Sequence, residues 1–530
     1  MDYDLILKAW SQVIGSENLL TENQAIQNAQ TATFPTQQQI VAILCPANRE
    51  EIQQCLKIAN EFSVPIYPIS RGRNWGYGSR VPVQDKCALL DLSRLNRIID
   101  FNQSLAYVTV EPGVTQQQLY QFLTENAPSL WMDCTGSSAD SSLIGAIMER
   151  GFGHTPYGDR FANVCGLEVV LPSGECIHTG FTRFPNALAG SVYRWGIGPY
   201  IDGLFTQSNL GIVTKMTLWL MPAPEYFQAF YFSIEKDEQL PELINALRPL
   251  RLNGTIKSAV HIANSYKVLS TIRQYPWEET RGKTPLPTDV MDYFAQTWDL
   301  GAWNGSGGLY GSRQQVAAAR QLIKKALRGK VRRLLFLDDQ TLKIVQWLAK
   351  PYQLFTGLNL PELIKIVKPV FGLMKGIPTD TQIASIYWRK KSPPPQEMNP
   401  DLDQCGLMWC SPIAPLDGQH AAKIYEIVND TLTDYQFEPI IAMTMLTERC
   451  LSCVISITYD REVAGEDQQA LKCYQDLNEK LSGAGYYPYR LGIKSMQILE
   501  QAEKNYQNLL KNLKKSLDPN DILAPGRYSS

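Results

Sequence analysis

The chain has 530 residues, of which 44% are hydrophobic and 19% charged, and its 50 basic and 52 acidic side chains give a formal charge of −2. This composition excludes a mainly disordered or fibrous chain and leaves ample material for a large buried core. The near-neutral charge argues against a nucleic-acid-binding protein, which carries an excess of basic residues on one face. No apolar run approaches the roughly 18 residues that span a bilayer, so we expect no membrane segment.

The N-terminus and the cysteines indicate the same compartment. Asp2 and Asp4 stand where an export signal would carry Lys or Arg, so we expect no export. The 11 cysteines are an odd number scattered along the chain, which fits reduced thiols in a cytosolic setting. The sequence therefore predicts a cytoplasmic globular protein.

Strand-like and helical segments alternate in the first part of the chain. Short strands are expected at residues 41–45, 66–70 and 107–111. Asn48 with Glu51 three residues later predicts the start of a helix, and Thr115 with Gln118 predicts the start of another, which runs to about residue 126. This alternation is typical of a layered α+β or α/β domain.

The pattern changes after residue 220. Residues 221–226 (MPAPEY) form a proline-marked break, residues 313–327 have the periodicity of an amphipathic helix, and residues 391–396 (KSPPPQ) form a stiff surface loop. We therefore expect a domain boundary near residue 222. A second domain follows, and the last 45 residues or so are expected to return to the first.

The common nucleotide and metal motifs are absent from the sequence. It contains no G-x-G-x-x-G and no G-x-x-x-x-G-K-[ST], so neither a Rossmann site nor a P-loop is encoded. The four histidines are His154, His178, His261 and His420. None has metal-ligand spacing to another, and we expect no metal site.

Cys450 and Cys453 form a C-x-x-C that could suggest redox chemistry or zinc. The run 449–459 alternates as a strand does, and residues three apart in a strand point to opposite faces. The two sulfur atoms then cannot meet. Cys405 and Cys410 lack the spacing of a zinc ribbon.

A glycine-rich loop follows the strand expected at residues 66–70. Residues 69–80 (ISRGRNWGYGSR) hold three glycines, and backbone N–H groups in such a turn can form an anion-binding nest. The same pattern also fits an ordinary hairpin loop with solvated arginines.

Two further segments combine turns with strands. Residues 151–175 contain the turn Pro156-Tyr157-Gly158-Asp159, in which Asp159 suits turn formation as well as chemistry. Residues 203–218 (GLFTQSNLGIVTKMTL) bring small polar residues and a glycine into a β-branched strand. That pattern suits close backbone contact with a planar ligand.

Taken together, these segments resemble the vanillyl-alcohol oxidase and p-cresol methylhydroxylase family of flavoproteins. RNWGYG matches the family's pyrophosphate loop, TPYGD its catalytic turn and GLFTQSNLGIVT its second flavin-contacting stretch. The resemblance continues in order through residues 375–380 (KGIPTD), 411–418 (SPIAPLDG), 486–496 (YYPYRLGIKSM) and 518–528 (DPNDILAPGRY). It spans nearly the whole chain.

The resemblance implies an α+β fold. Residues 1–222 would form an FAD-binding domain of two subdomains, residues 223–484 a cap domain on an antiparallel sheet, and residues 485–530 a return to the FAD-binding domain. It also implies FAD as the cofactor, a small phenolic substrate and a homodimer.

Matching positions supply the expected cofactor contacts. They are Ser70, Arg71, Gly72, Arg73, Asn74, Gly76, Tyr77 and Gly78 in the first loop; Thr135 and Gly136; Gly153, Pro156, Tyr157 and Gly158; Asn209, Gly211, Ile212 and Val213; and Arg527.

The resemblance also implies a reaction. Tyr77, Tyr489 and Arg490 would hold the oxygen of a 4-substituted phenol as phenolate, which makes the benzylic carbon a hydride donor to the flavin. Asp159 would lie near the flavin and act as base toward the water that adds to the resulting quinone methide.

The sequence departs from the family pattern at two positions. Ser452 falls where members with covalent FAD carry histidine or tyrosine, and Cys453 points to the other strand face, so non-covalent FAD is expected. Arg160 stands where many members have histidine. His154 is expected to be a hydrogen-bonded turn residue.

Two other functions stay open. Relatives with the same flavin domain oxidise 2-hydroxy acids, but they typically use metal-binding histidines, which this chain lacks. A catalytically idle flavin-binding scaffold is the other alternative. The joint presence of Asp159, Tyr489 and Arg490 argues against it.

Overall fold

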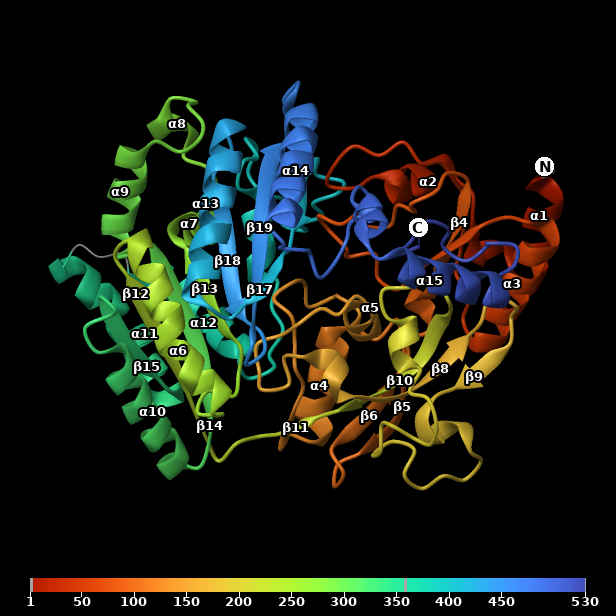
Figure 1. The fold of residues 1–530 in the computed structure, drawn as a ribbon, viewed down its shortest axis with the longest axis horizontal. Helices are drawn as coiled ribbons and strands as arrows, with labels where there is room; N and C mark the ends of the chain where they lie inside the picture. The colour runs from red at the N-terminus through yellow and green to blue at the C-terminus, as the bar shows by residue number, and fades with distance from the viewer. Residues whose placement is uncertain (1–2, 357–359, 530) are drawn as a thin grey trace.

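The computed structural model describes residues 3–356 and 360–529. Its elements form two neighbouring parts, one built on two N-terminal sheets and the other on a sheet of eight strands. In Figure 1 the eight-stranded sheet with its helices lies on the left, and the N-terminal sheets lie on the right together with the C-terminal helix α15. Helices combined with largely antiparallel sheets agree with the α+β class expected from the sequence.

The first sheet has the order β1-β2-β4-β3 and is parallel apart from β1. Its elements are β1 (Leu19–Leu20), β2 (Ile40–Leu44), β3 (Ile66–Ile69) and β4 (Cys87–Asp91), with α1 (Tyr3–Ile14) and α3 (Arg49–Phe62) on one face and α2 (Asn23–Gln30) on the other. The predicted start of α3 is confirmed, because the Asn48 side chain accepts a hydrogen bond from the Glu51 backbone N at 2.9 Å.

The second sheet is antiparallel and has the order β5-β6-β10-β8-β9. Its strands are β5 (Ile98–Asn102), β6 (Tyr107–Val110), β8 (Val164–Val170), β9 (Cys176–His178) and β10 (Ile212–Trp219), and α4 (Gln116–Asn126) and α5 (Leu143–Met148) pack on it. Thr115 caps α4 as predicted, accepting from the backbone N of Gln118 at 3.1 Å. Two short strands, β7 (Leu130–Trp131) and β11 (Met221–Pro222), pair with each other just before the chain enters the large sheet at β12.

The eight-stranded sheet is antiparallel throughout, in the order β15-β12-β14-β13-β18-β19-β16, with β17 also paired to β19. Its strands are β12 (Tyr226–Ile234), β13 (Val260–Asn264), β14 (Trp303–Gly311), β15 (Arg333–Leu337), β16 (Cys405–Cys410), β17 (Ile413–Pro415), β18 (Ile440–Met445) and β19 (Cys450–Asp460).

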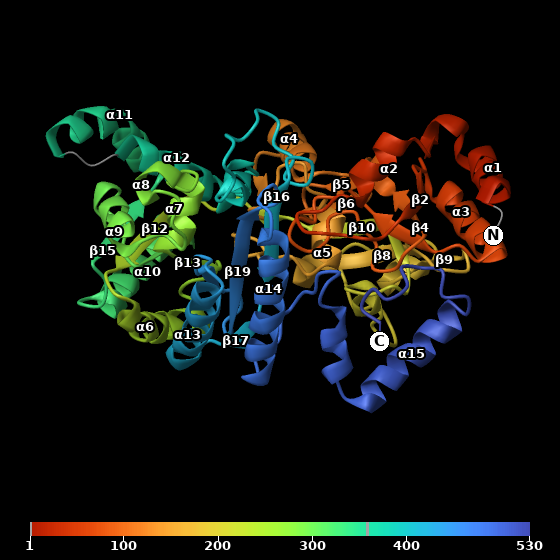
Figure 2. The same cartoon turned by 90° about the horizontal axis from the view of Figure 1, so that it is seen from above.

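Helices cover the two faces of this sheet unequally. One face carries α6 (Leu240–Leu252), α10 (Arg313–Leu327), α13 (Gly418–Asp434) and α14 (Glu466–Gly483), which share a large apolar core with the strands. Figure 2 shows α11 (Asp339–Thr356) and α12 (Leu360–Leu373) on the opposite side from α6 and α13, near α7 (Ser265–Ile272), α8 (Trp277–Thr280) and α9 (Thr288–Thr297). No helix in the described ranges is long and apolar enough to cross a membrane.

The end of the chain packs against the N-terminal sheets. After α15 (Lys504–Leu517), the backbone N of Ile66 donates to the carbonyl of Ile522, and the backbone N of Ala524 donates to the carbonyl of Ile66, both at 2.7 Å. Ile522 and Leu523 belong to the same apolar core as α1 and α3. This pairing beside β3 brings Arg527 to the edge of the site described below.

Candidate active site

A cavity of about 680 Å³ lies between the N-terminal sheets and the large sheet. On the N-terminal side its wall contains residues 70–75 after β3, residues 135–137, and residues 211–213 at the start of β10. Across from them lie strands of the large sheet, α7, α12 and the 3₁₀ helix η7 (Thr381–Tyr387). Segments far apart in the sequence therefore line one cavity.

The cavity extends across the face of the large sheet opposite α6 and α13. Consecutive strands each contribute to its wall: Ser456 from β19, Thr444 from β18, Ala263 from β13, Asn304 from β14, Tyr231 from β12 and Leu335 from β15. Five strand spacings correspond to roughly 24 Å. Leu363, Val367 and Val370 of α12 line the same space, so part of it is apolar.

The glycine-rich loop is held by backbone geometry that only glycine adopts readily. Gly72 has φ +65°, and a Cβ there would meet the Arg80 side chain at 2.6 Å. Arg71 and Arg73 both pair with Asp140, at 2.5 and 3.0 Å. The alternative of a loop with freely solvated arginines therefore does not hold, because both guanidinium groups are fixed at the cavity wall.

Three of the predicted catalytic residues meet at one corner of the cavity. The guanidinium carbon of Arg490 lies 4.4 Å from the ring centroid of Tyr77, and Arg490 Nη2 donates to Asn74 Oδ1 at 2.6 Å. The Tyr77 hydroxyl is 2.7 Å from Ser411 Oγ, and Tyr489 lines the same wall. Burial raises the pKa of both tyrosines, so both hydroxyls stay protonated and can donate hydrogen bonds.

A partly buried carboxylate that the sequence patterns did not reveal anchors this corner. Glu149 accepts from Arg527 Nη2 at 2.7 Å and from the Tyr528 hydroxyl at 2.8 Å, and it lies 3.3 Å from Arg490 Nε. Burial alone would raise the pKa of Glu149, but the charges of Arg527 and Arg490 hold it below its usual value. Two cations share one anion, which leaves one net positive charge at the cavity wall.

Two histidines stack in the cavity wall. The rings of His154 and His261 lie 4.1 Å apart at 25°, and His261 Nδ1 is 3.0 Å from Thr444 Oγ1. His154 Nδ1 is 3.4 Å from the carbonyl of Cys134, as expected for a hydrogen-bonded turn residue. Burial lowers the pKa of both imidazoles, so both are neutral near pH 7. His261 Nε2 is buried and has no partner among the described residues.

The structure does not bring Asp159 to the cavity. Its side chain is exposed at the start of the 3₁₀ helix η3 (Arg160–Asn163), outside the cavity wall. The buried carboxylate that contacts this turn is that of Asp133, which accepts from Thr155 Oγ1 at 2.7 Å and lies 3.5 Å from Arg160 Nε. Because Asp159 has no access to the cavity, its expected role as base is not carried into the proposal below.

Several expected cofactor contacts also lie outside the cavity wall. They are Gly76, Gly78, Gly153, Pro156, Tyr157, Gly158 and Asn209. Gly76 and Gly78 instead pack closely: a Cβ at Gly76 would press on Leu407 and Trp409, and one at Gly78 would lie 2.8 Å from Ile493. Asn209 Nδ2 donates to the Ala524 carbonyl at 3.2 Å and so helps to hold the C-terminal segment. The other expected contacts line the cavity: Ser70, Arg71, Gly72, Arg73, Asn74, Tyr77, Thr135, Gly136, Gly211, Ile212, Val213 and Arg527.

The chain is similar to known proteins over nearly its whole length. Residues 40–180 match a family described as FAD binding domain. The 4-cresol dehydrogenase [hydroxylating] flavoprotein subunit of Pseudomonas putida is 30% identical, over 99% of this chain and 95% of that protein. The solved structure of p-cresol methylhydroxylase with substrate bound superposes with a TM-score of 0.89 at 30% identity, covering 99% of this chain and 96% of the other.

The chain belongs to the p-cresol methylhydroxylase family. Its cofactor is FAD, and it is an enzyme, as the resemblance predicted. 4-Ethylphenol oxidase from Gulosibacter chungangensis has the same fold, with a TM-score of 0.89 and 26% identity over 99% of this chain and 97% of that one. The 1'-carboxy-chondrochloren decarboxylase of Chondromyces crocatus is 45% identical, over 98% of this chain and 96% of that protein.

The cavity of this family member fits FAD. Two guanidinium groups, Arg71 and Arg73, have buried Nε atoms without hydrogen-bond partners among the described residues, which suits the charged pyrophosphate. Gly145 lies in the cavity wall. A Cβ added at this position would come within 2.3 Å of Ser70 Oγ, so a larger residue does not fit there and no side chain fills this part of the cavity. Serine hydroxyls at 137, 141 and 142 add further polar groups.

The expected attachment position lies outside the cavity wall. Ser452 is fully buried and lies outside the cavity wall, whereas Val454 and Ser456 on the same strand face line it. Cys453 lies on the other face, within the apolar core under α13 and α14. The predicted alternation of β19 is confirmed, and Cys450 and Cys453 are both free thiols.

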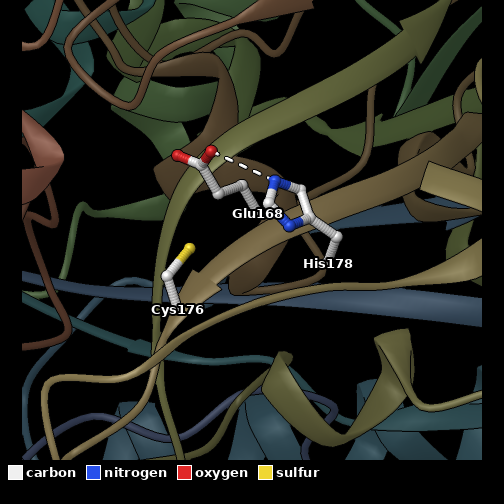
Figure 3. A group of neighbouring side chains, drawn as sticks. All are labelled: Glu168, Cys176 and His178. Atoms are coloured by element: carbon white, nitrogen blue, oxygen red, sulfur yellow. Dashed lines mark ion pairs between the residues drawn. The ribbon is translucent and has the colours of Figure 1, made fainter. Parts of the chain in front are cut away.

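Three possible metal ligands, Glu168, Cys176 and His178, gather at the edge of the second sheet (Figure 3). His178 Nε2 is 3.3 Å from Glu168 Oε2. The same carboxylate oxygen is also 2.8 Å from Lys215 Nζ and 3.1 Å from an Arg49 nitrogen. Because two cations already neutralise Glu168, this group is better explained as an ion-pair network than as a metal site.

Proposed function

We propose that the protein oxidises a 4-substituted phenol, with FAD as the hydride acceptor. The observation that supports this most is the corner formed by Arg490, Tyr77 and Tyr489 in the cavity wall. A phenolic oxygen placed there would meet one net positive charge and two neutral hydroxyl groups. These are the donors that stabilise a phenolate in a site shielded from water.

The arrangement is preorganised for this anion. Asn74 and Glu149 fix the guanidinium plane of Arg490, so little side-chain freedom remains to be lost when the substrate binds. Loss of the phenol proton makes the ring electron-rich, and a hydride can then leave the benzylic carbon to give a quinone methide. FAD bound along residues 70–74 would supply the two-electron acceptor.

Water or another nucleophile can then add to the quinone methide, which restores the aromatic ring. In place of Asp159, we assign His261 as the residue that accepts a hydrogen bond from this water. Its Nε2 has no partner in the described ranges, and its ring is neutral. A neutral imidazole can take a proton that an imidazolium cannot.

A second candidate function is oxidative decarboxylation, and the 45% identity to a decarboxylase over 98% of the chain favours it. The two-electron oxidation would be the same. If the carbon next to the benzylic position carries a carboxylate, the quinone methide can lose CO₂. The electron pair of the broken C–C bond then forms a new C=C bond, and the ring becomes a phenolate again.

Anaerobic mixing with phenols tests the proposal. FAD-loaded enzyme should lose its yellow colour with 4-ethylphenol or 3-(4-hydroxyphenyl)propanoate but not with 4-ethylcyclohexanol, which cannot form a phenolate. Product mass then separates the two candidates, because hydration retains the carboxylate and decarboxylation removes 44 Da as CO₂. Bleaching by a 2-hydroxy acid such as lactate, with none by phenols, would overturn the proposal.

Three expectations from the resemblance stay predictions: non-covalent attachment of FAD, a homodimer and a cytoplasmic location. Light scattering of the purified holoenzyme measures the oligomeric state directly.

A further inference from the structure

Lys267 is a cation in the cavity wall that has no counterion among the described residues. It lies in the first turn of α7, which follows β13 and starts at the capping residue Asn264. Its ammonium group donates to Ser385 Oγ of η7 at 3.0 Å, and this is its one side-chain partner within the described part of the chain. Val268 and Leu363 line the cavity beside it.

Each of the other basic residues of the cavity wall has a carboxylate partner. Within the described ranges, Arg71 and Arg73 pair with Asp140, Arg490 and Arg527 pair with Glu149, and Arg333 pairs with Asp299. Lys267 differs from these five because no carboxylate of the described chain lies within ion-pair distance.

An ammonium group in such a place is unfavourable unless a ligand compensates it. Burial lowers the pKa of Lys267 to about 8, which still leaves most of the group protonated near pH 7. The ammonium group of Lys267 is half-buried, faces the cavity and has one hydroxyl partner in the described part of the chain, so it retains unused hydrogen-bonding capacity. An anion in the cavity would satisfy both the charge and the free N–H donors.

We propose that Lys267 binds a carboxylate carried on the substrate's side chain, a specificity that rests on the proposed phenol oxidation. The corner of Arg490 and Tyr77 lies next to Ser411 and β16, whereas Lys267 follows β13, three strands further along the sheet. Three strand spacings are about 14 Å. If the phenol oxygen binds at Arg490, a carboxylate that reaches Lys267 must be carried on the substituent para to the hydroxyl group. The substrate class is therefore a phenol with a carboxylated side chain.

Matched substrates separate this role from general damage. We would titrate FAD-loaded enzyme anaerobically with 4-propylphenol, 3-(4-hydroxyphenyl)propanoate and 4-(4-hydroxyphenyl)butanoate, and obtain Kd from stopped-flow flavin reduction. The measured quantity is the ratio of Kd for each carboxylate to Kd for 4-propylphenol. Lys267→Met should raise this ratio by about 10- to 100-fold, the range for losing one charge-assisted hydrogen bond. Lys267→Arg should restore part of the loss, and Lys423→Met, on the exposed side of α13, is the matched control.

Other outcomes would overturn the inference. An unchanged ratio in Lys267→Met means that the ammonium does not contact the carboxylate. Equal weakening of all three phenols means that Lys267 acts on the ring, on FAD or on the fold.

The role of Lys267 can still be tested if the proposed phenol oxidation is wrong. If no phenol reduces the wild-type flavin, calorimetric titration of the oxidised holoenzyme with 3-(4-hydroxyphenyl)propanoate still tests Lys267. Weaker binding to Lys267→Met than to wild type supports the carboxylate site, and equal binding contradicts it.

Discussion

Arg490 lies over the ring of Tyr77, with its guanidinium carbon 4.4 Å from the ring centroid. The two residues are more than 400 positions apart in the sequence and meet because the segment after α14 returns to the N-terminal loop. The backbone N of Ile493 donates to the carbonyl of Tyr77 at 3.0 Å and so fixes this return. One contact therefore joins the expected flavin loop to the positive charge of the expected phenol site.

Removing the guanidinium should weaken phenol binding and slow flavin reduction. Arg490→Ala should raise Kd and lower the reduction rate by about 10- to 100-fold each, because a charge-assisted hydrogen bond to the phenolate is lost. Arg490→Lys keeps the charge but loses the planar fork, so an intermediate effect is expected. Stopped-flow reduction measures both values, and Arg449→Ala, at an exposed site, is the control. Wild-type kinetics in Arg490→Ala would show that the phenol binds elsewhere.

Asp159→Asn should leave flavin reduction by phenols within about twofold of wild type, since the carboxylate is exposed and outside the cavity wall. Asp133→Asn, in contrast, removes the buried partner of Arg160 and should lower the melting temperature. Steady-state assays and thermal unfolding compare the two variants. A large rate loss in Asp159→Asn with an unchanged melting temperature would reinstate its catalytic role.

Lys267→Met should stabilise the protein at neutral pH. The pKa of Lys267 is lowered from 10.5 to about 8 in the folded state, so the unfolded chain binds more protons between these values. The penalty for holding the ammonium in the cavity wall is therefore full below about pH 8 and disappears as the pH rises toward 10.5. At pH 7 it is at most on the order of 3 kcal/mol. Melting temperatures at pH 7 and pH 9.5 should show a gain for the variant that is smaller at the higher pH; a lower melting temperature at pH 7 would contradict this.

FAD should leave the protein on acid precipitation. Ser452 is buried away from the cavity, and Cys453 lies in the apolar core on the other side of β19. We expect a colourless pellet and a yellow supernatant whose mass is that of FAD. A yellow pellet would mean that another wall residue forms the bond, and peptide mapping would then locate it among Tyr67, Tyr77, Tyr231, Tyr489, His154 and His261.

Local patterns predicted much of the fold. Asn48 and Thr115 cap the helices that were expected from them, residues 313–327 form α10, and the alternation of residues 450–459 places Cys450 and Cys453 on opposite faces. Each of these features depends on neighbours within a few residues, so periodicity and capping chemistry are sufficient to predict it.

The site was less predictable, because its chemistry depends on contacts between distant segments. Nothing around Glu149 distinguishes it from a surface glutamate until α5 and the C-terminal segment meet. Asp159 shows the reverse case. A Gly-Asp turn forms whether or not its carboxylate reaches a cavity, and here the Asp159 side chain is exposed while that of Asp133 is inaccessible. Lys267 and His261 are recognisable only from the folded chain, where both line the cavity with polar atoms that lack partners among the residues that the structure describes.

The most direct test of phenol oxidation is an isotope effect on flavin reduction. 4-Ethylphenol and its benzylic dideuterated form would be mixed anaerobically with the FAD-loaded enzyme in a stopped-flow instrument. Because the benzylic C–H bond breaks as the flavin is reduced, the deuterated phenol should reduce it several-fold more slowly, with the same Kd. Equal reduction rates together with bleaching by 2-hydroxy acids would contradict the account and move the reaction to another substrate class.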